Sequence, residues 1–280
     1  MASISFPLEP HSTFKGSAIV STPLGSEGGV YQLEMRAEPD NRLTPEFISL
    51  SLLPALDYIE LAWHRACKEG RKDGALVLVG ERGVGKFFSN GLQLECLKEY
   101  PTFFRDYYYL LLSRLLTFPL HTIAAINGHC FAGGLCLALA CDWRVCRPDR
   151  TWLSMNELQF GAPLPSGMAS VLSARLSPPV IRDVMLTARR YTAPEALEAG
   201  LVDQVVKEGG SERCLEEAVR RAGEVKGLAK TGVLTAMKRT LYALCLEQLK
   251  QHEALQLGEV QKDSQRRFEE LVKAEGMAKL

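Results

Sequence analysis

Two short apolar segments of this sequence each lead into a glycine-rich turn. ALVLV at 75–79 precedes FFSNG at 87–91, and TIAAI at 122–126 precedes AGG at 132–134. Uninterrupted apolar runs of this length are typical of strands buried on both faces of a parallel sheet. Where such a strand turns into a helix, the first backbone N–H groups of the helix have no partner and can bind an oxyanion. The sequence therefore predicts an α/β fold in which two glycine turns present amide donors to one site.

The segment GERGVGK, residues 80–86, also matches most of the nucleotide-binding P-loop. In that motif a serine or threonine follows the lysine, because its hydroxyl binds the Mg²⁺ ion on the phosphates. Here the next residue is Phe87. A nucleoside triphosphatase is therefore disfavoured, and an absence of Mg²⁺-dependent ATP binding would exclude it.

The charge and hydropathy of the chain argue against nucleic-acid and membrane partners. The 33 basic and 33 acidic residues of the 280 cancel, so the whole chain has no strong attraction to nucleic acid or to an anionic membrane. Its longest uninterrupted apolar run, 131–141, is much shorter than the ~18 residues that a membrane span requires. The first residues, MASISFPLEPHSTF, lack the charged start and the apolar block of a secretory signal.

The cysteines and histidines do not form a recognisable framework. The 8 cysteines are scattered without a C-x-x-C pair, and the 5 histidines have no metal-ligand spacing. We therefore expect small buried thiols in a reducing compartment, and no metal site.

Local patterns predict the elements around the two strands. The β-rich runs at 17–22 and 30–36 flank a glycine turn and predict a hairpin. The TPE sequence at 44–46 predicts the start of a helix that ends near Gly70, with a kink at Pro54. We also predict a mostly helical segment at 95–118 and a helix after two prolines at 177–187. A helix with a capping box should follow at 192–200, and a strand after it at 201–206.

The pattern changes near residue 210. From Ser211 onward the strand-like runs cease, and apolar residues recur at three- and four-residue intervals, as in Leu234, Met237, Leu241 and Leu244. We therefore divide the chain into a ββα core over 1–210 and a helical region over 211–280, which packs on the core or on a neighbouring subunit.

Four segments in order resemble the successive signatures of the crotonase superfamily, also called the enoyl-CoA hydratase/isomerase family. They are FFSNGLQL, INGHCFAGGLCLALACDWRV, MNELQFGAPLP and TAPEALEAGLVDQVV. The resemblance covers roughly residues 15 to 210. It implies an α/β fold, a spiral of repeated ββα units, with C-terminal helices that build a homotrimer or a hexamer.

The resemblance also implies an acyl-CoA thioester as the ligand. Its carbonyl oxygen would lie in an oxyanion hole formed by the backbone N–H groups of Asn90 and Gly133. The substrate-binding segment would comprise residues of the first turn together with Gly133: Ser89, Asn90, Gly91, Leu92 and Gln93. No separate cofactor is implied, because CoA is part of the substrate. This chain departs from the family in having Gln93 where most members have aspartate, and alanine in place of the first glycine of the second turn.

One substitution separates two reactions of the family. Members that hydrate a double bond use two glutamates; here the later one is Glu157, but the earlier position is Cys136. A thiol is a poor hydrogen-bond acceptor and cannot replace a carboxylate that holds and deprotonates water. Moving a double bond from C3 to C2 requires one base, which Glu157 can supply. The chain therefore most resembles plant and fungal peroxisomal Δ3,Δ2-enoyl-CoA isomerases, and Glu157 is the predicted catalytic residue.

Two other functions remain open at this point. One is an enoyl-CoA hydratase, or another crotonase reaction, in which different groups hold the water. The other is a non-catalytic acyl-CoA-binding subunit. The residues Ala278-Lys279-Leu280 are a variant of the S-K-L peroxisomal address, which predicts a peroxisomal location and binding to the import receptor.

Overall fold

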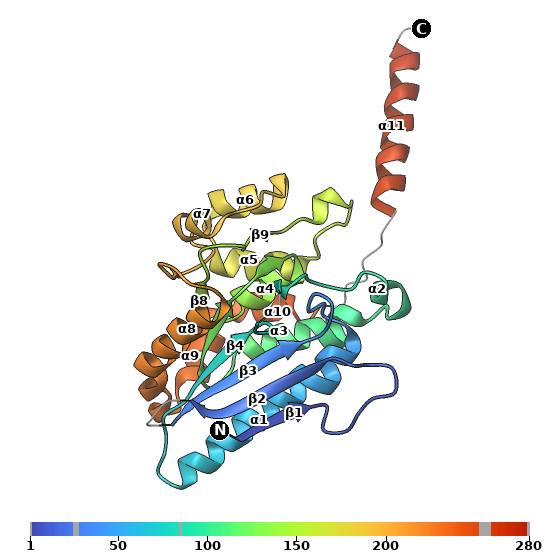
Figure 1. Cartoon of the computed structure of the whole chain (residues 1–280). Coiled ribbons are helices and arrows are strands. Elements are labelled where there is room, and N and C mark those ends of the chain that lie inside the picture. Colours follow the sequence, from blue (N-terminus) through green and yellow to red (C-terminus); the bar gives the residue numbers. More distant parts are fainter. Residues whose placement is uncertain (1, 25–27, 84–85, 252–258, 279–280) are drawn as a thin grey trace.

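The structure, a computed structural model, describes residues 2–24, 28–83, 86–251 and 259–278 (Figure 1). Within these ranges the strands form two sheets. The larger sheet has the order β1 (Ala2–Phe6), β2 (Ser17–Leu24), β3 (Val30–Arg36), β4 (Ala75–Val79), β6 (His121–Ile126), β8 (Trp143–Cys146) and β10 (Gln204–Val205). The smaller one has the order β5 (Phe87–Ser89), β7 (His129–Phe131) and β9 (Leu153–Ser154).

Helices follow pairs of strands along the chain. Those up to residue 187 are η1 (Phe47–Leu52), α1 (Leu53–Lys68), α2 (Cys96–Glu99), η2 (Phe104–Tyr108), α3 (Tyr109–Leu116), α4 (Gly133–Leu139), η3 (Glu157–Gln159), α5 (Ser166–Arg175) and α6 (Pro178–Thr187). The later ones are α7 (Ala193–Glu198), α8 (Ser211–Val225), η4 (Lys226–Thr231), α9 (Leu234–Leu241), α10 (Ala243–Gln248) and α11 (Glu259–Ala278).

The ββα repeat explains why there are two sheets. β4, β6 and β8 each belong to the larger sheet, and each is followed by one strand of the smaller sheet and then by helix. Strands β3, β4, β6 and β8 pair in parallel, as do β5, β7 and β9. The predicted α/β spiral of ββα units is therefore confirmed.

Burial on both faces accounts for the short apolar strands. In β4, Leu76 and Leu78 face the main core, while Val77 and Val79 face a second cluster that includes Ala218 of α8. Because side chains alternate along a strand, both faces of β4 require apolar residues, and the sequence ALVLV provides them.

Most local predictions are confirmed. Strands β2 and β3 form the predicted antiparallel hairpin. The Thr44 hydroxyl accepts the Phe47 amide at 3.1 Å, as an N-cap does, and Thr192 and Glu195 form the predicted capping box. All eight cysteines are unpaired, and each except the partly exposed Cys67 is buried.

The helix predicted from residue 44 to near Gly70 is also confirmed; it changes from π to α hydrogen bonding at Leu53, next to Pro54, which cannot donate a backbone hydrogen bond. Two other predictions need correction. The helical segment at 95–118 is interrupted after Glu99, because Tyr100, which precedes Pro101, has a non-helical backbone. The predicted strand at 201–206 is only two residues long, because β10 pairs with β8 alone at the edge of the sheet.

The C-terminal helices are joined to the core by a buried ion pair. Lys238 of α9 donates from Nζ to the Leu120 carbonyl at 2.8 Å and pairs with Asp142 at 2.6 Å. Burial lowers the pKa of Lys238, which the negative charge of Asp142 partly counteracts. Removing either partner would leave a buried charge unpaired, which typically costs about 3–5 kcal/mol. This part of the helical region therefore packs on the core.

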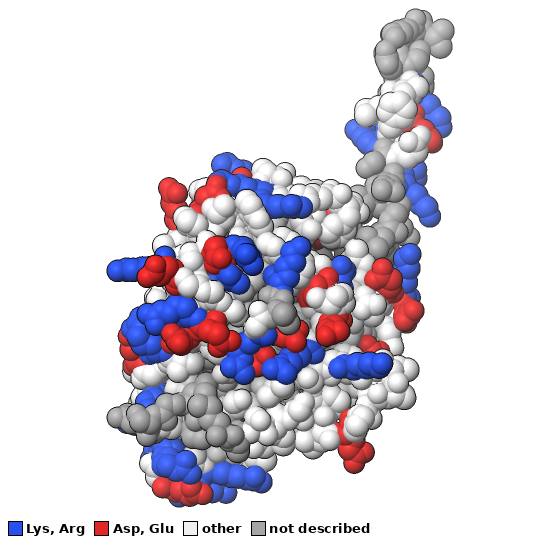
Figure 2. Space-filling view, viewed as in Figure 1, with Lys and Arg blue, Asp and Glu red and all other residues white. Residues whose placement is uncertain are grey.

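The surface of the described residues carries mixed charge. Figure 2 shows basic and acidic side chains interspersed over the visible face. In Figure 1, α11 extends away from the other elements. No helix among the described residues is both long and apolar enough to cross a bilayer. Of the predicted import signal, Lys279 and Leu280 lie outside the described residues.

Candidate active site

A cavity of about 320 Å³ lies where the two glycine turns meet. Its wall includes Asn90 and Leu92 from the first turn, Ala132 and Gly133 from the second, and Glu157. The other wall residues are Arg42, Leu94, Leu97, Phe104, Asn156, Phe160, Ala162, Pro163, Pro165 and Met168. Three predicted substrate-binding residues, Asn90, Leu92 and Gly133, therefore line the cavity.

The remaining predicted substrate-binding residues lie behind or beside this wall. The buried Ser89 hydroxyl donates to the Asn41 carbonyl at 2.7 Å and accepts the Gly91 amide at 3.2 Å, so it supports the turn. Gln93 lines a neighbouring hollow, which shares only Arg42 with the cavity. Among the described residues, neither Ser89, Gly91 nor Gln93 is part of the cavity wall.

The smaller sheet brings the site together. The first turn follows β5, the second follows β7, and Glu157 comes shortly after β9. These three strands are parallel neighbours, so their carboxyl ends lie at one edge of the sheet. Ligand sites of parallel sheets are commonly found at this edge.

The two turns are in direct contact because Gly91 has no side chain. Its φ is +86°, and a Cβ at this position would lie 2.9 Å from the Ala132 Cβ and 3.1 Å from the Gly133 nitrogen. A Cβ on Gly134 would lie only 2.5 Å from the Ser89 carbonyl oxygen. Glycines at 91 and 134 therefore allow the backbones of the two turns to pack closely.

The second turn has an unusual backbone conformation that exposes an amide. Ala132 has φ +50° and ψ −124°, a combination that non-glycine residues rarely adopt, and its own amide donates to the Ser154 carbonyl at 2.8 Å. The next residue, Gly133, is the first of α4. Within the described part of the chain, the Gly133 amide has no hydrogen-bond acceptor, as expected for the first turn of a helix.

The amide of Asn90 is in a different situation. It donates to the Asp40 carbonyl at 2.9 Å, and the Asn90 side-chain amide donates to the Asp40 carboxylate at 2.6 Å. To bind an oxyanion, the Asn90 amide would have to share or exchange its present acceptor. No local sequence pattern predicts this contact, because Asp40 lies far from Asn90 in the chain. The oxyanion role of Asn90 stays a prediction.

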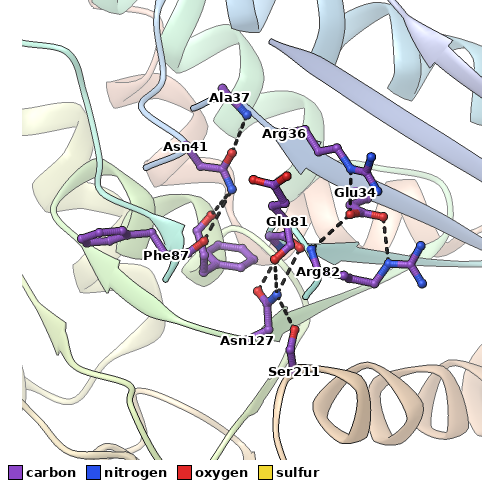
Figure 3. A network of polar contacts seen from close by, with 11 residues as sticks. Glu34, Arg36, Ala37, Asn41, Glu81, Arg82, Phe87, Asn127 and Ser211 are labelled. Carbon is purple, nitrogen blue, oxygen red and sulfur yellow. Dashed lines mark hydrogen bonds and ion pairs between the residues drawn. The ribbon is translucent and has the colours of Figure 1, made fainter. Parts of the chain in front are cut away.

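Two buried asparagines fix the segment that leads to the first turn (Figure 3). Asn41 accepts the Ala37 amide at 2.7 Å and donates to the Phe88 carbonyl at 3.2 Å. Asn127 accepts the Gly80 amide and donates to the Gly80 carbonyl, both at 3.1 Å. Asn127 therefore holds the start of this segment at Gly80, and Asn41 holds its end at Phe88. Neither asparagine was predicted from the sequence to have this role.

The same view shows that Arg82, in the segment that resembles a P-loop, is bonded to a buried carboxylate (Figure 3). The fully buried Glu34 accepts hydrogen bonds from Arg82, through the amide at 3.1 Å and Nε at 2.8 Å, and from Arg36 at 2.9 Å. Burial alone would raise the pKa of Glu34, but these arginine hydrogen bonds hold it below its ordinary value. Arg82 is thus already paired with a carboxylate.

Glu157 has the environment of a base. It opens the short helix η3, and its Oε2 atom is buried without a hydrogen-bond partner in the described structure. Burial raises the pKa of Glu157 from 4.5 to about 7. A carboxyl group with a pKa near neutrality can both accept and return a proton at physiological pH.

Cys136 does not supply a second acid or base. It is fully buried in α4, and burial, with the negative charge of Glu157 nearby, raises its thiol pKa well above the ordinary value. The thiol is therefore protonated and neutral. Glu157 is the one carboxylate in the cavity wall as described.

The chain belongs to the enoyl-CoA hydratase/isomerase family, whose family model matches residues 27–277. It is 29% identical over 230 residues to enoyl-CoA delta isomerase 3 of Arabidopsis thaliana, covering 78% of this chain and 91% of the relative. It is 34% identical to the peroxisomal enoyl-CoA delta isomerase 1 of Arabidopsis thaliana over 149 residues, which are 50% of this chain and 60% of the relative.

Hydratases are among the similar proteins as well. A putative enoyl-CoA hydratase of Thermus thermophilus is 35% identical over 215 residues, covering 74% of this chain and 78% of the relative. The crystal structure of an enoyl-CoA hydratase from Mycobacterium marinum superposes with a TM-score of 0.65 at 25% identity, covering 82% of this chain and 94% of that chain. The family is thus established, but the similar proteins carry the names of two different reactions, isomerisation and hydration.

Proposed function

We propose that the protein is a Δ3,Δ2-enoyl-CoA isomerase of fatty acid β-oxidation. The observation that carries this proposal is that, among the described residues, one carboxylate, Glu157, lines a cavity with mostly apolar wall residues, beside a Gly133 amide without an acceptor and with a neutral thiol at position 136. Two of the Arabidopsis relatives described above carry the name enoyl-CoA delta isomerase.

In the proposed reaction Glu157 removes the C2 proton of a 3-enoyl-CoA and returns it at C4. The negative charge of the intermediate enolate would rest on the thioester oxygen, where the Gly133 amide donates a hydrogen bond and Asn90 supplies the second donor. A positioned base typically contributes about 10²–10⁴ in rate, and one oxyanion donor about 10²–10³. Both are needed for useful turnover.

The cavity wall suggests how the substrate lies. Leu97, Phe104 and Met168 offer an apolar surface for the acyl chain. Arg42, whose Nε atom pairs with Asp40 at 3.2 Å and leaves its other donors available, lines both the cavity and the adjoining hollow, which also contains Lys15. We place the anionic part of CoA along this route.

Hydration is the second candidate, and one observation favours it. Asn156 lines the same cavity, and its Oδ1 atom is buried without a partner among the described residues. A water bound between Asn156 and Glu157 could attack a 2-enoyl-CoA. A non-catalytic acyl-CoA-binding subunit would instead bind both esters and convert neither.

The product formed from each ester distinguishes these functions. An isomerase given 3-enoyl-CoA produces the conjugated thioester, which is detected as a gain in ultraviolet absorbance without a change in mass. A hydratase given 2-enoyl-CoA loses that absorbance and adds the mass of one water. Rapid hydration without isomerisation would refute the proposed reaction.

The raised pKa of Glu157 predicts the pH dependence of isomerisation. Only the carboxylate accepts a proton, so kcat/KM should rise with pH and level off above the pKa of about 7. At pH 5 only about 1% of the group is ionised, and we expect a rate roughly 100-fold below the plateau. Initial rates from pH 5 to 9 measure this; an inflection near the ordinary pKa of 4.5 would contradict a desolvated Glu157.

We also propose that the chain assembles into a homotrimer or hexamer through its C-terminal helices. Helices α9 and α10 expose large apolar side chains, with Met237 at 67%, Leu241 at 71% and Leu244 at 85% exposure. Exposed apolar groups of this extent commonly mark protein interfaces. Light scattering after size exclusion gives the mass, and a monomer at micromolar concentration would contradict the assembly.

Import into peroxisomes through Ala278-Lys279-Leu280 is a further proposal. It is supported by the sequence of these residues and by the peroxisomal name of one relative. A fluorescent protein fused to the N-terminus should enter peroxisomes, and deletion of the three residues should leave it in the cytosol. An unchanged location after deletion would exclude this signal.

A further inference from the structure

Tyr108 lies directly behind the second glycine turn. It is the last residue of η2 and is fully buried, and its hydroxyl donates to the Gly133 carbonyl at 2.6 Å. The same hydroxyl is 3.1 Å from the point where a Cβ on Gly133 would stand. Tyr108 is not part of the cavity wall, although Phe104 of the same segment is. The phenol therefore touches the donor turn from the protein side.

The turn that it touches requires support. Ala132 holds the rare backbone conformation described above, which a non-glycine residue keeps only when its surroundings fix it. The Ser154 carbonyl fixes the residue from one side by accepting the Ala132 amide. Tyr108 fixes the following residue from the other side by donating to the Gly133 carbonyl. The direction of the Gly133 amide is set between these two bonds.

The surroundings of Tyr108 keep its hydroxyl protonated, so that it can donate a hydrogen bond. Burial, with the nearby Cys136 and Glu157, raises the pKa of Tyr108 well above its ordinary value, so the hydroxyl stays protonated. Cys136 is close enough to the hydroxyl to contribute to this shift in pKa. Of these two neighbours, the Gly133 carbonyl is the stronger acceptor and is the one that receives the hydrogen bond.

We propose that Tyr108 is a positioning residue, whose hydroxyl holds the first turn of α4 so that the Gly133 amide points at the thioester oxygen. This inference rests on the proposed function, because it assigns the Gly133 amide to the oxyanion hole. Tyr108 itself touches no reacting atom; it acts through the Gly133 backbone.

The Tyr108→Phe variant tests this role, since it removes one oxygen atom and keeps the ring contacts. The probe is butanoyl-CoA labelled with ¹³C at the carbonyl, a saturated ester that is not isomerised. Its bound carbonyl stretch, measured by infrared difference spectroscopy, should move to higher wavenumber in the variant, because a misaligned amide polarises the carbonyl less. With 3-enoyl-CoA, kcat should fall roughly 10- to 100-fold, while KM and the inflection of the pH profile stay near the parent values.

Two matched variants serve as controls. Tyr107→Phe removes the hydroxyl of the preceding tyrosine, for which the described structure has no hydrogen bond, and should leave both readouts unchanged. Cys136→Ala removes the thiol near the Tyr108 hydroxyl and should leave the carbonyl stretch unchanged. A circular dichroism melt verifies that each variant is folded.

The outcomes separate this inference from the proposed function. A parental carbonyl stretch and kcat in Tyr108→Phe would overturn the inference, as would an equal shift in Cys136→Ala, which would mean that the hydroxyl acts through the thiol. If the parent protein polarises the saturated ester but isomerises nothing, the proposed reaction is wrong, while a carbonyl shift in Tyr108→Phe still supports the positioning role.

Discussion

The Glu157→Gln variant is expected to isomerise 3-enoyl-CoA about 10²–10⁴-fold more slowly than the parent protein. Glutamine has the shape of glutamate but cannot accept the C2 proton. Binding of CoA esters should persist, because the apolar wall and the Gly133 amide are unchanged. Initial rates and isothermal titration with butanoyl-CoA measure the two quantities.

Glu99→Gln is the matched control for this experiment. Glu99 is exposed on α2 and lies outside the cavity wall, so its replacement should leave the rate unchanged. If Glu157→Gln turns over at the parental rate, Glu157 is not the base.

The Glu157→Gln variant should also be more stable than the parent above neutral pH. The carboxyl of Glu157 ionises near 4.5 in the unfolded chain but near 7 in the folded protein. The folded state therefore loses stability as pH rises through this interval, because it must hold a buried carboxylate without a partner. Glutamine has no such charge, so the melting temperature of Glu157→Gln should exceed that of the parent at pH 8 and match it near pH 4.

The Gly91→Ala variant should lose about 10²–10³ in kcat, the contribution of one oxyanion donor. At φ +86° an alanine is strained, and its Cβ would lie 2.9 Å from the Ala132 Cβ and 3.0 Å from the Phe131 carbonyl oxygen. Because these contacts are too short, the two turns must separate, and the Gly133 amide moves with the second turn. Steady-state kinetics and a thermal melt measure the effect.

Gly232→Ala separates backbone strain from the effect on the site. Gly232 has φ +71° with nothing within 4 Å of an added Cβ, so this variant has similar strain without the clash. It should be destabilised by about 1–2 kcal/mol and keep the parental kcat. Equal kcat values for Gly91→Ala and Gly232→Ala would show that the contact between the two turns does not matter for catalysis.

Patterns within a few neighbouring residues made much of the fold predictable. The burial of β4 on both faces, the hairpin of β2 and β3, and the capping box at Thr192 depend on sequence neighbours, and the structure confirms each of them. Placing Glu157 and Gly133 in one cavity required the ordered family signatures, since no local pattern relates them.

The remaining features depend on contacts between distant parts of the chain. The Asp40 carbonyl that accepts the Asn90 amide, the Tyr108 hydroxyl at Gly133, and the asparagines at 41 and 127 are polar pairings set by tertiary structure. A single sequence contains the donors and acceptors but not their partners. Strand β1 was missed for a related reason, because it pairs with β2 only, at the edge of the larger sheet.

The arrangement of β5, β7 and β9 has a consequence for how such enzymes diversify. The spacing of neighbouring parallel strands is a constant of sheet hydrogen bonding, about 4.8 Å, so the strands that lead into the two glycine turns keep their separation whichever side chains surround them. The acid–base group, in contrast, is a side chain that a single codon change can replace. Substitutions at positions such as 136 and 157 can therefore change the reaction that a protein with this scaffold catalyses. The backbone arrangement of the two glycine turns stays the same.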